Sequence, residues 1–184
     1  MGGTLVKILH TKGQMLSLFM IMFLLGILYV NIFAKHSVTE LQVFSEYFLT
    51  QYTGMDVDAR EYLLYLTRIR LLPFILVLVL TFTKVRKISA AVTVFWTGFS
   101  GGILLSLAAM NMGIKGILLC IVGIFPHFLF YIPAYIVLLV YSWQYPSNQW
   151  NRQKTVFIAA AMLTGILTEA YINPGLVRGF LNLL

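Results

Sequence analysis

Five long apolar runs separated by polar segments constrain this fold more than any other feature of the sequence. A helix needs about 20 predominantly apolar residues to cross the hydrocarbon core of a bilayer. Only 10% of the 184 residues are charged, whereas a soluble domain carries about 25%. The sequence therefore predicts an all-α integral membrane protein with one polytopic domain, residues 1–184. The predicted spans are residues 15–34, 62–83, 88–110, 116–141 and 156–172.

The longest polar segment, residues 36–61, separates the first two spans and holds five of the six acidic residues. Between Val38 and Phe48, apolar residues recur at three- and four-residue steps, which predicts an amphipathic helix. Whether that helix lies on lipid or on the helix bundle stays open. Its polar face has few basic residues, so it differs from a typical basic helix at a membrane surface.

The basic residues predict the direction of the spans, because Lys and Arg accumulate in cytoplasmic loops. Five spans place the termini on opposite sides of the membrane. One side then holds seven basic residues and no acid: Lys7, Lys12, Lys84, Arg86, Lys87, Arg152 and Lys154. The other side holds Lys35, Arg60, Lys115 and Arg178, with Arg68 and Arg70 at the membrane edge. The interpretation is an N-in, C-out membrane protein. This scattered charge does not form a nucleic-acid-binding patch.

The fourth span contains Pro126, His127 and Pro133. Each proline lacks an N–H group and clashes with the carbonyl four residues earlier. One interpretation is a bent but packed helix. The other is a broken helix that builds a cavity or a docking surface. An ionisable residue inside a span is a functional hypothesis by default, so His127 is a candidate site residue.

Glu169 is the single acidic residue within a predicted span, and it lies near the outer end of the fifth. His127 is expected about 16 Å from the outer end of the fourth span, at about 1.5 Å per helical residue. A direct contact between His127 and Glu169 therefore requires a shifted register. A structural ion pair between Glu169 and Arg68 or Arg70 is favoured over a proton or ion relay.

Glycines are frequent in the third and fourth spans. Gly98 and Gly102 form a G-x-x-x-G pair, a spacing that allows helices to approach closely. Further small positions are Gly101, Gly113, Gly116 and Gly123. Packing within the chain is favoured over dimerisation through this face.

No catalytic constellation is found, so a non-enzymatic protein is expected. The sequence has no H-E-x-x-H zinc motif, no G-x-S-x-G elbow, no P-loop and no pair of intramembrane aspartates. The one cysteine, Cys120, lies in an apolar run and is interpreted as a buried small residue. No metal site and no cofactor are predicted.

Two stretches taken in order resemble a known family. The first is GFSGGILLSLAAMNMGIKGILLCIVGIFPHFLFYIPAYI, residues 98–136, and the second is EAYINP, which includes Glu169, Asn173 and Pro174. This order is similar to that of the stage II sporulation protein M family of bacterial membrane proteins. Members have about five spans, a glycine-rich third, a proline-containing fourth, and an acidic residue followed by a proline near the C-terminus.

The resemblance implies a non-enzymatic membrane scaffold for engulfment during endospore formation. Family members act at the septum with two peptidoglycan hydrolases, stage II sporulation proteins D and P, to remodel septal wall. Apart from membrane lipid, those hydrolases are the expected partners. The alternative is a small transporter or channel subunit that uses a broken fourth helix with His127 and Glu169. An intramembrane enzyme is the least favoured hypothesis.

Overall fold

The structure is a computed structural model that describes residues 2–34, 49, 51 and 58–183. These residues form helices joined by short turns, and the described part contains no strand. The elements are α1 (Gly2–Tyr29), the π-helical segment η1 (Val30–Ala34), α3 (Ala59–Thr81), α4 (Arg86–Met112), α5 (Ile114–Gln144), α6 (Arg152–Leu167), the π-helical segment η4 (Thr168–Ile172) and α7 (Asn173–Leu181). The expected amphipathic helix at Val38–Phe48 lies outside the described residues.

Within the described part of the chain, five helical segments are long and apolar enough to cross a membrane. They are Gly13–Phe33, Ala59–Thr81, Arg86–Met112, Ile114–Gln144 and Arg152–Leu181. The first four differ from the predicted spans by at most three residues at either end. A multi-pass membrane protein is compatible with this composition, and the exposed surface agrees with it. Large apolar side chains such as Leu72 and Trp96 are 69% and 72% exposed.

The helix that carries the fifth predicted span does not end at residue 172. The helix continues from α6 through η4 into α7, so the candidate span is 30 residues long. Pro174 lies in the first turn of α7, where the missing N–H of a proline removes no helical hydrogen bond. Pro174 therefore begins a helical segment rather than following the end of one.

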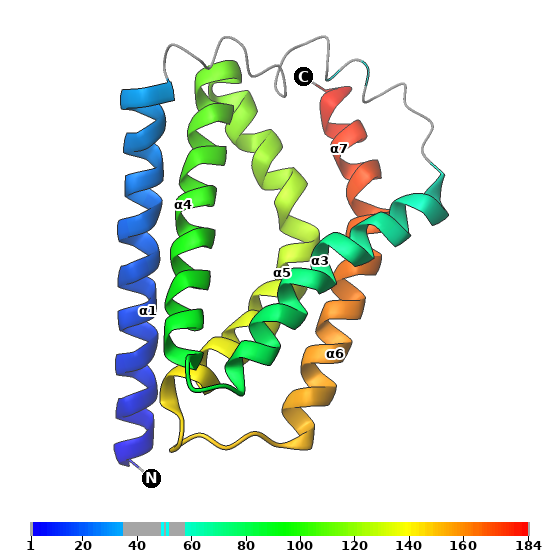
Figure 1. The fold of residues 1–184 in the computed structure, drawn as a ribbon. Helices are drawn as coiled ribbons and strands as arrows, with labels where there is room; N and C mark the ends of the chain where they lie inside the picture. The colour runs from blue at the N-terminus through cyan, green and yellow to red at the C-terminus, as the bar shows by residue number, and fades with distance from the viewer. Residues whose placement is uncertain (1, 35–48, 50, 52–57, 184) are drawn as a thin grey trace.

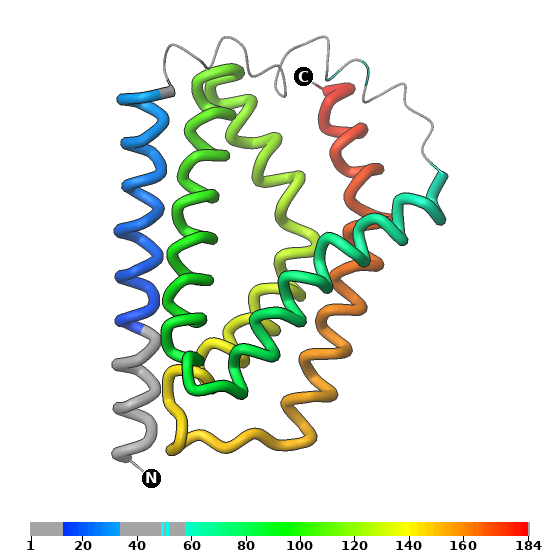
Figure 2. The backbone as a smooth tube through the Cα atoms, in the orientation of Figure 1, coloured from blue at the N-terminus to red at the C-terminus, as the bar shows by residue number. Residues whose placement is uncertain are grey.

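Helix α5 is continuous over its 31 residues, with Pro126 and Pro133 inside it. Of the two interpretations of the fourth span, the broken helix is therefore wrong, and the bent but packed helix agrees with the structure. Figure 2 shows that the axis changes direction about midway along the helix. Each proline removes one backbone hydrogen bond, and the remaining bonds of the helix hold the chain on both sides of the bend.

The helices form two groups that α5 connects. Helix α1 packs along α4, while α3, α5 and α6 surround the main apolar core. Figure 1 shows α1 beside α4, and α3 crossing the bundle at a slant. That core consists of Phe74, Tyr131, Ala134, Leu138, Ile158, Met162 and Ile166.

The two termini lie at opposite ends of the bundle, as Figure 1 shows. The N-terminus shares its end with the α3–α4 turn and the α5–α6 loop. The C-terminus shares the other end with the turn between α4 and α5. In that turn Gly113 has a φ of 59°, a conformation that glycine adopts without a steric penalty.

Candidate functional site

A buried carboxylate, Glu169, is the centre of the most polar site between the helices. Glu169 is only 4% exposed. Arg70 approaches it from α3 with two nitrogen atoms: Nε donates to Oε2 at 2.9 Å and to Oε1 at 3.1 Å, and a terminal guanidinium nitrogen also contacts Oε1. This two-pronged arrangement matches the planar guanidinium to the carboxylate and fixes the relative position of the helices. Of the two candidate arginines, Arg70 makes this ion pair, and the exposed Arg68 does not.

Helix α5 contributes two further side chains to Glu169. The Tyr131 hydroxyl donates a hydrogen bond to Oε2 at 2.8 Å. His127 places Nε2 3.7 Å from Oε1, and its residue is 3% exposed. The four side chains Arg70, His127, Tyr131 and Glu169 are called the polar cluster below. They join α3, α5 and the fifth span at one point.

The expectation that His127 lies too deep to meet Glu169 is wrong. It assumed that the fifth span ends at residue 172. Since the span continues to Leu181, Glu169 lies near its middle rather than a few residues from its end. The two side chains therefore lie at the same level.

Glu169 belongs to the π-helical segment η4, Thr168–Ile172. A π-helical turn inserts an extra residue into a helix and is common at functional sites. It changes which face the following residues occupy. Thr168 hydroxyl donates to the carbonyls of Thr164 and Gly165 where α6 passes into this turn.

Small and aromatic residues set the spacing around the polar cluster. A Cβ added at Gly165 would collide with the Tyr131 ring, so this glycine allows α6 to approach α5. The Arg70 guanidinium also lies 5.6 Å from the centre of the Tyr131 ring, within the range of a cation–π interaction. The Tyr131 ring is thus held between α6 and the arginine.

The remaining candidate residues lie around the polar cluster or away from it. Asn173 and Pro174 begin α7, one turn beyond Glu169. The Asn173 Oδ1 and His127 Nδ1 atoms are buried and have no hydrogen-bond partner among the described residues. Pro126 and Pro133 lie on α5 without a polar contact to Glu169.

The glycine pair of the third span packs against α1, within the chain. A Cβ atom added at Gly98 would lie 2.7 Å from the Phe19 carbonyl oxygen. A Cβ atom added at Gly102 would collide with the Phe23 carbonyl oxygen. On α1, Gly26 approaches the Phe99 carbonyl in the same way. Gly116 meets Ala108 where α5 turns back along α4, whereas Gly101, Gly113 and Gly123 have no contact closer than 3.7 Å.

Sequence reasoning missed Tyr131 and Gly165. Tyr131 follows His127 by four residues, so both lie on the same face of α5. That spacing was a usable signal for the tyrosine. No sequence pattern predicts the role of Gly165, because that role depends on which aromatic ring of another helix packs against it.

The chemistry available to the polar cluster is hydrogen bonding and charge pairing. Both carboxylate oxygens of Glu169 already accept bonds from Arg70 and Tyr131, so the group is engaged rather than open to a substrate. Within the described part of the chain, no group of three His, Cys, Asp or Glu side chains could hold a metal ion. Cys120 is buried and has a free thiol.

Over the residues that the structure describes, the fold and the polar cluster define a helical protein with five candidate membrane spans and an internal ion pair. No family model matches the chain, and no curated protein or solved structure matches it either.

Proposed function

We propose that this protein is a non-enzymatic membrane scaffold that positions peptidoglycan hydrolases during sporulation. The proposal rests on the resemblance of residues 98–136 and 169–174 to the stage II sporulation protein M family. One structural observation supports it most directly: His127 and Glu169, one from each stretch, lie 3.7 Å apart in one buried polar cluster. Because Glu169 is fully engaged by Arg70 and Tyr131, a structural role suits it better than a reactive one.

The proposed orientation is N-in and C-out, and the proposed location is the septum of the dividing cell. It follows from the bias of Lys and Arg toward the end that holds the N-terminus. The hydrolases would then bind on the opposite side of the membrane, the side that the sequence predicts for the C-terminus and for the acid-rich segment 36–61. Stage II sporulation proteins D and P are the proposed partners.

Complementation tests this function. The chain is expressed in a spore-forming bacterium that lacks its own family member, and engulfment is imaged with a membrane dye. We expect the septum to curve around the smaller cell. The His127→Ala variant should also restore engulfment if it accumulates normally. Loss of engulfment in a variant that accumulates to the parent level would contradict a purely structural role for His127.

A small transporter or channel subunit is the second candidate. Two observations favour it: Glu169 lies in a π-helical turn, and the buried Nδ1 of His127 has no described partner. Purified protein in liposomes should then move protons or small solutes across the bilayer. The Glu169→Gln variant should abolish that flux, and a parent protein without flux would remove this candidate.

A further inference from the structure

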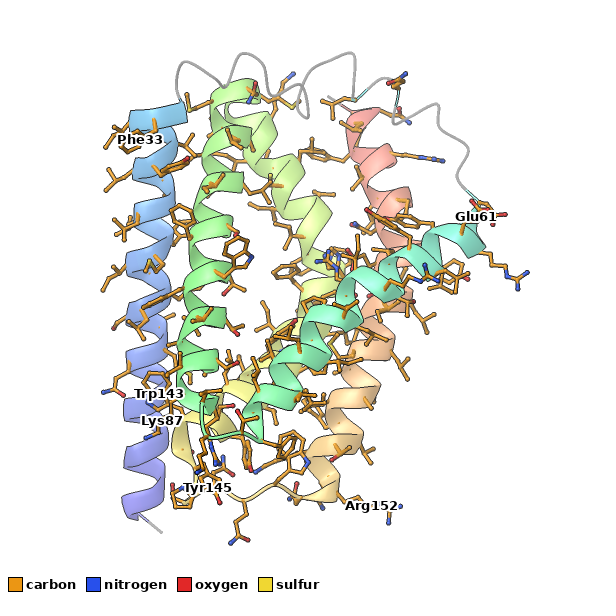
Figure 3. All side chains as sticks on the ribbon, in the orientation of Figure 1. Phe33, Glu61, Lys87, Trp143, Tyr145 and Arg152 are labelled. Carbon is orange, nitrogen blue, oxygen red and sulfur yellow. The ribbon has the colours of Figure 1, made fainter. Side chains whose placement is uncertain are left out.

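The end of the bundle that holds the N-terminus carries a concentrated positive charge that the proposed function does not use. Its basic side chains come from two connections that follow α3 and α5: Lys84, Arg86 and Lys87, then Arg152 and Lys154. We call these five residues the basic end. Figure 3 shows Lys87, Tyr145 and Arg152 at this end and Glu61 far from it.

No described carboxylate neutralises the basic end. The acidic residues that the structure describes are Asp58, Glu61 and Glu169. Asp58 and Glu61 begin α3, whose other end leads to the basic turn, and Glu169 pairs with Arg70 in the polar cluster. The side chains of Lys84, Lys87 and Arg152 are exposed and have no hydrogen bond or ion pair with described residues.

An aromatic cluster holds the two connections together beneath this charge. Phe82, at the end of α3, packs edge-on against Trp150 with ring centres 5.1 Å apart. Trp150 also packs edge-on against Tyr141 of α5 at 5.0 Å. These contacts fix the α3–α4 turn against the α5–α6 loop. Aromatic residues of this kind are typical of the level at which lipid headgroups meet the hydrocarbon layer.

Tyr145 extends this cluster, because its ring packs edge-on against Tyr141, and it holds Arg86 in place. The Arg86 guanidinium lies over the Tyr145 ring, 3.5 Å from the ring centre. Its Nε donates to the Thr83 carbonyl at 3.0 Å. Stacking on the ring occupies only the flat face of the guanidinium. The terminal nitrogen atoms at its edge remain able to donate hydrogen bonds to the oxygens of a phosphate group.

We propose that the basic end binds the phosphate groups of anionic phospholipids in the adjoining leaflet. Membrane topology alone requires basic residues in these loops but does not require that they be fixed in place. Here Arg86 is stacked and bonded, Lys84 and Lys87 flank it within the same turn, and no described acid competes for them. A phosphate diester at headgroup depth supplies the missing negative charge. The proposal does not depend on the scaffold function.

Tryptophan quenching by brominated lipids measures this binding. Trp143 and Trp150 lie at the basic end, and Trp96→Phe removes the remaining tryptophan, which lies midway along α4. The protein is reconstituted with brominated phosphatidylglycerol or brominated phosphatidylcholine. We expect brominated phosphatidylglycerol to bind about fivefold more tightly than brominated phosphatidylcholine. This ratio is the effect of one fully engaged charge near a membrane surface.

Two double variants separate this site from general charge. Lys84→Gln/Lys87→Gln should lower the preference, and Lys84→Arg/Lys87→Arg should retain it. Arg60→Gln/Arg68→Gln removes the same charge from the exposed surface of α3, nearer its start, and should leave the preference unchanged. Equal losses in both glutamine variants, or a parent protein without preference, would overturn the proposal.

Inorganic phosphate distinguishes a lipid headgroup from a soluble ligand. It is added to the parent protein at the ionic strength of a chloride control. The lipid preference should be the same in both salts, because screening is equal. A preference that disappears in phosphate alone would assign the site to a soluble phosphate and overturn the proposal.

Discussion

Two contacts between helices in this molecule are built in opposite ways. Helix α1 meets α4 through glycines, with the Phe19 and Phe23 carbonyl oxygens against Gly98 and Gly102. Helices α3, α5 and the fifth span meet through the polar cluster, in which Arg70 and Tyr131 hold Glu169. The first contact depends on the absence of side chains, and the second on their charge and hydrogen bonding.

The difference predicts how each contact fails. Lipid tails are as apolar as the helices, so helices in a membrane associate through close packing and polar contacts. The glycine contact should be damaged by any added atom. The polar cluster should be damaged most when one charge is removed and the other remains, because a lone charge inside a membrane is costly.

The largest effect is expected for Glu169→Gln. The variant keeps the shape of the side chain but leaves the Arg70 guanidinium without a counter-charge. We expect the free energy of unfolding to fall by about 3 kcal/mol, the lower end of the range for breaking a buried ion pair. The lower end applies because the Arg70 side chain is 37% exposed. Unfolding in mixed micelles with increasing sodium dodecyl sulfate measures it.

The double variant Arg70→Met/Glu169→Met is the matched control for charge pairing. Both charges are replaced by apolar side chains of similar length, so no charge is left alone. Replacing both members of a buried pair is often nearly neutral. The double variant should therefore be more stable than Glu169→Gln. A double variant that unfolds as easily as the single one would mean that packing, not charge, holds these helices.

Gly102→Ala should have the next largest effect, and it acts on the glycine contact. The added methyl group collides with the Phe23 carbonyl oxygen, which belongs to rigid helix backbone. Overpacking of this kind costs about 1–3 kcal/mol. Gly101→Ala is the control on the same helix, because its methyl group would lie 3.7 Å from the Phe23 ring, an ordinary contact. The same unfolding measurement compares them, and equal stability of the two variants would argue against a tight α1–α4 contact.

The glycine contact was more readable in the sequence than the polar cluster. The G-x-x-x-G spacing of Gly98 and Gly102 indicates close packing whichever helix is the partner. The apolar runs likewise predicted four spans to within three residues, because length and hydropathy are local properties.

The depth of the polar cluster along the helices could not be predicted from a local sequence pattern in the same way. The apolar pattern predicts that the fifth span ends at residue 172, and the predicted depth of Glu169 is counted from that end. A proline in the first turn of a helix and a proline after its end look alike in sequence, and the π-helical segment η4 gives no clear pattern either. The contact of His127 with Glu169 depends on register between two spans, which no local pattern carries.

Tyr131→Phe should have the smallest effect and should depend on the charge pair. The variant removes the hydroxyl that donates to Glu169 Oε2 and keeps the ring that packs against Gly165. Hydrogen bonds between membrane helices contribute about 0.6 kcal/mol on average. In the Arg70→Met/Glu169→Met background the hydroxyl has lost its acceptor, so the same substitution should no longer destabilise the protein. Equal losses in both backgrounds would show that the Tyr131 hydroxyl acts independently of Glu169, and the polar cluster would then not behave as one unit.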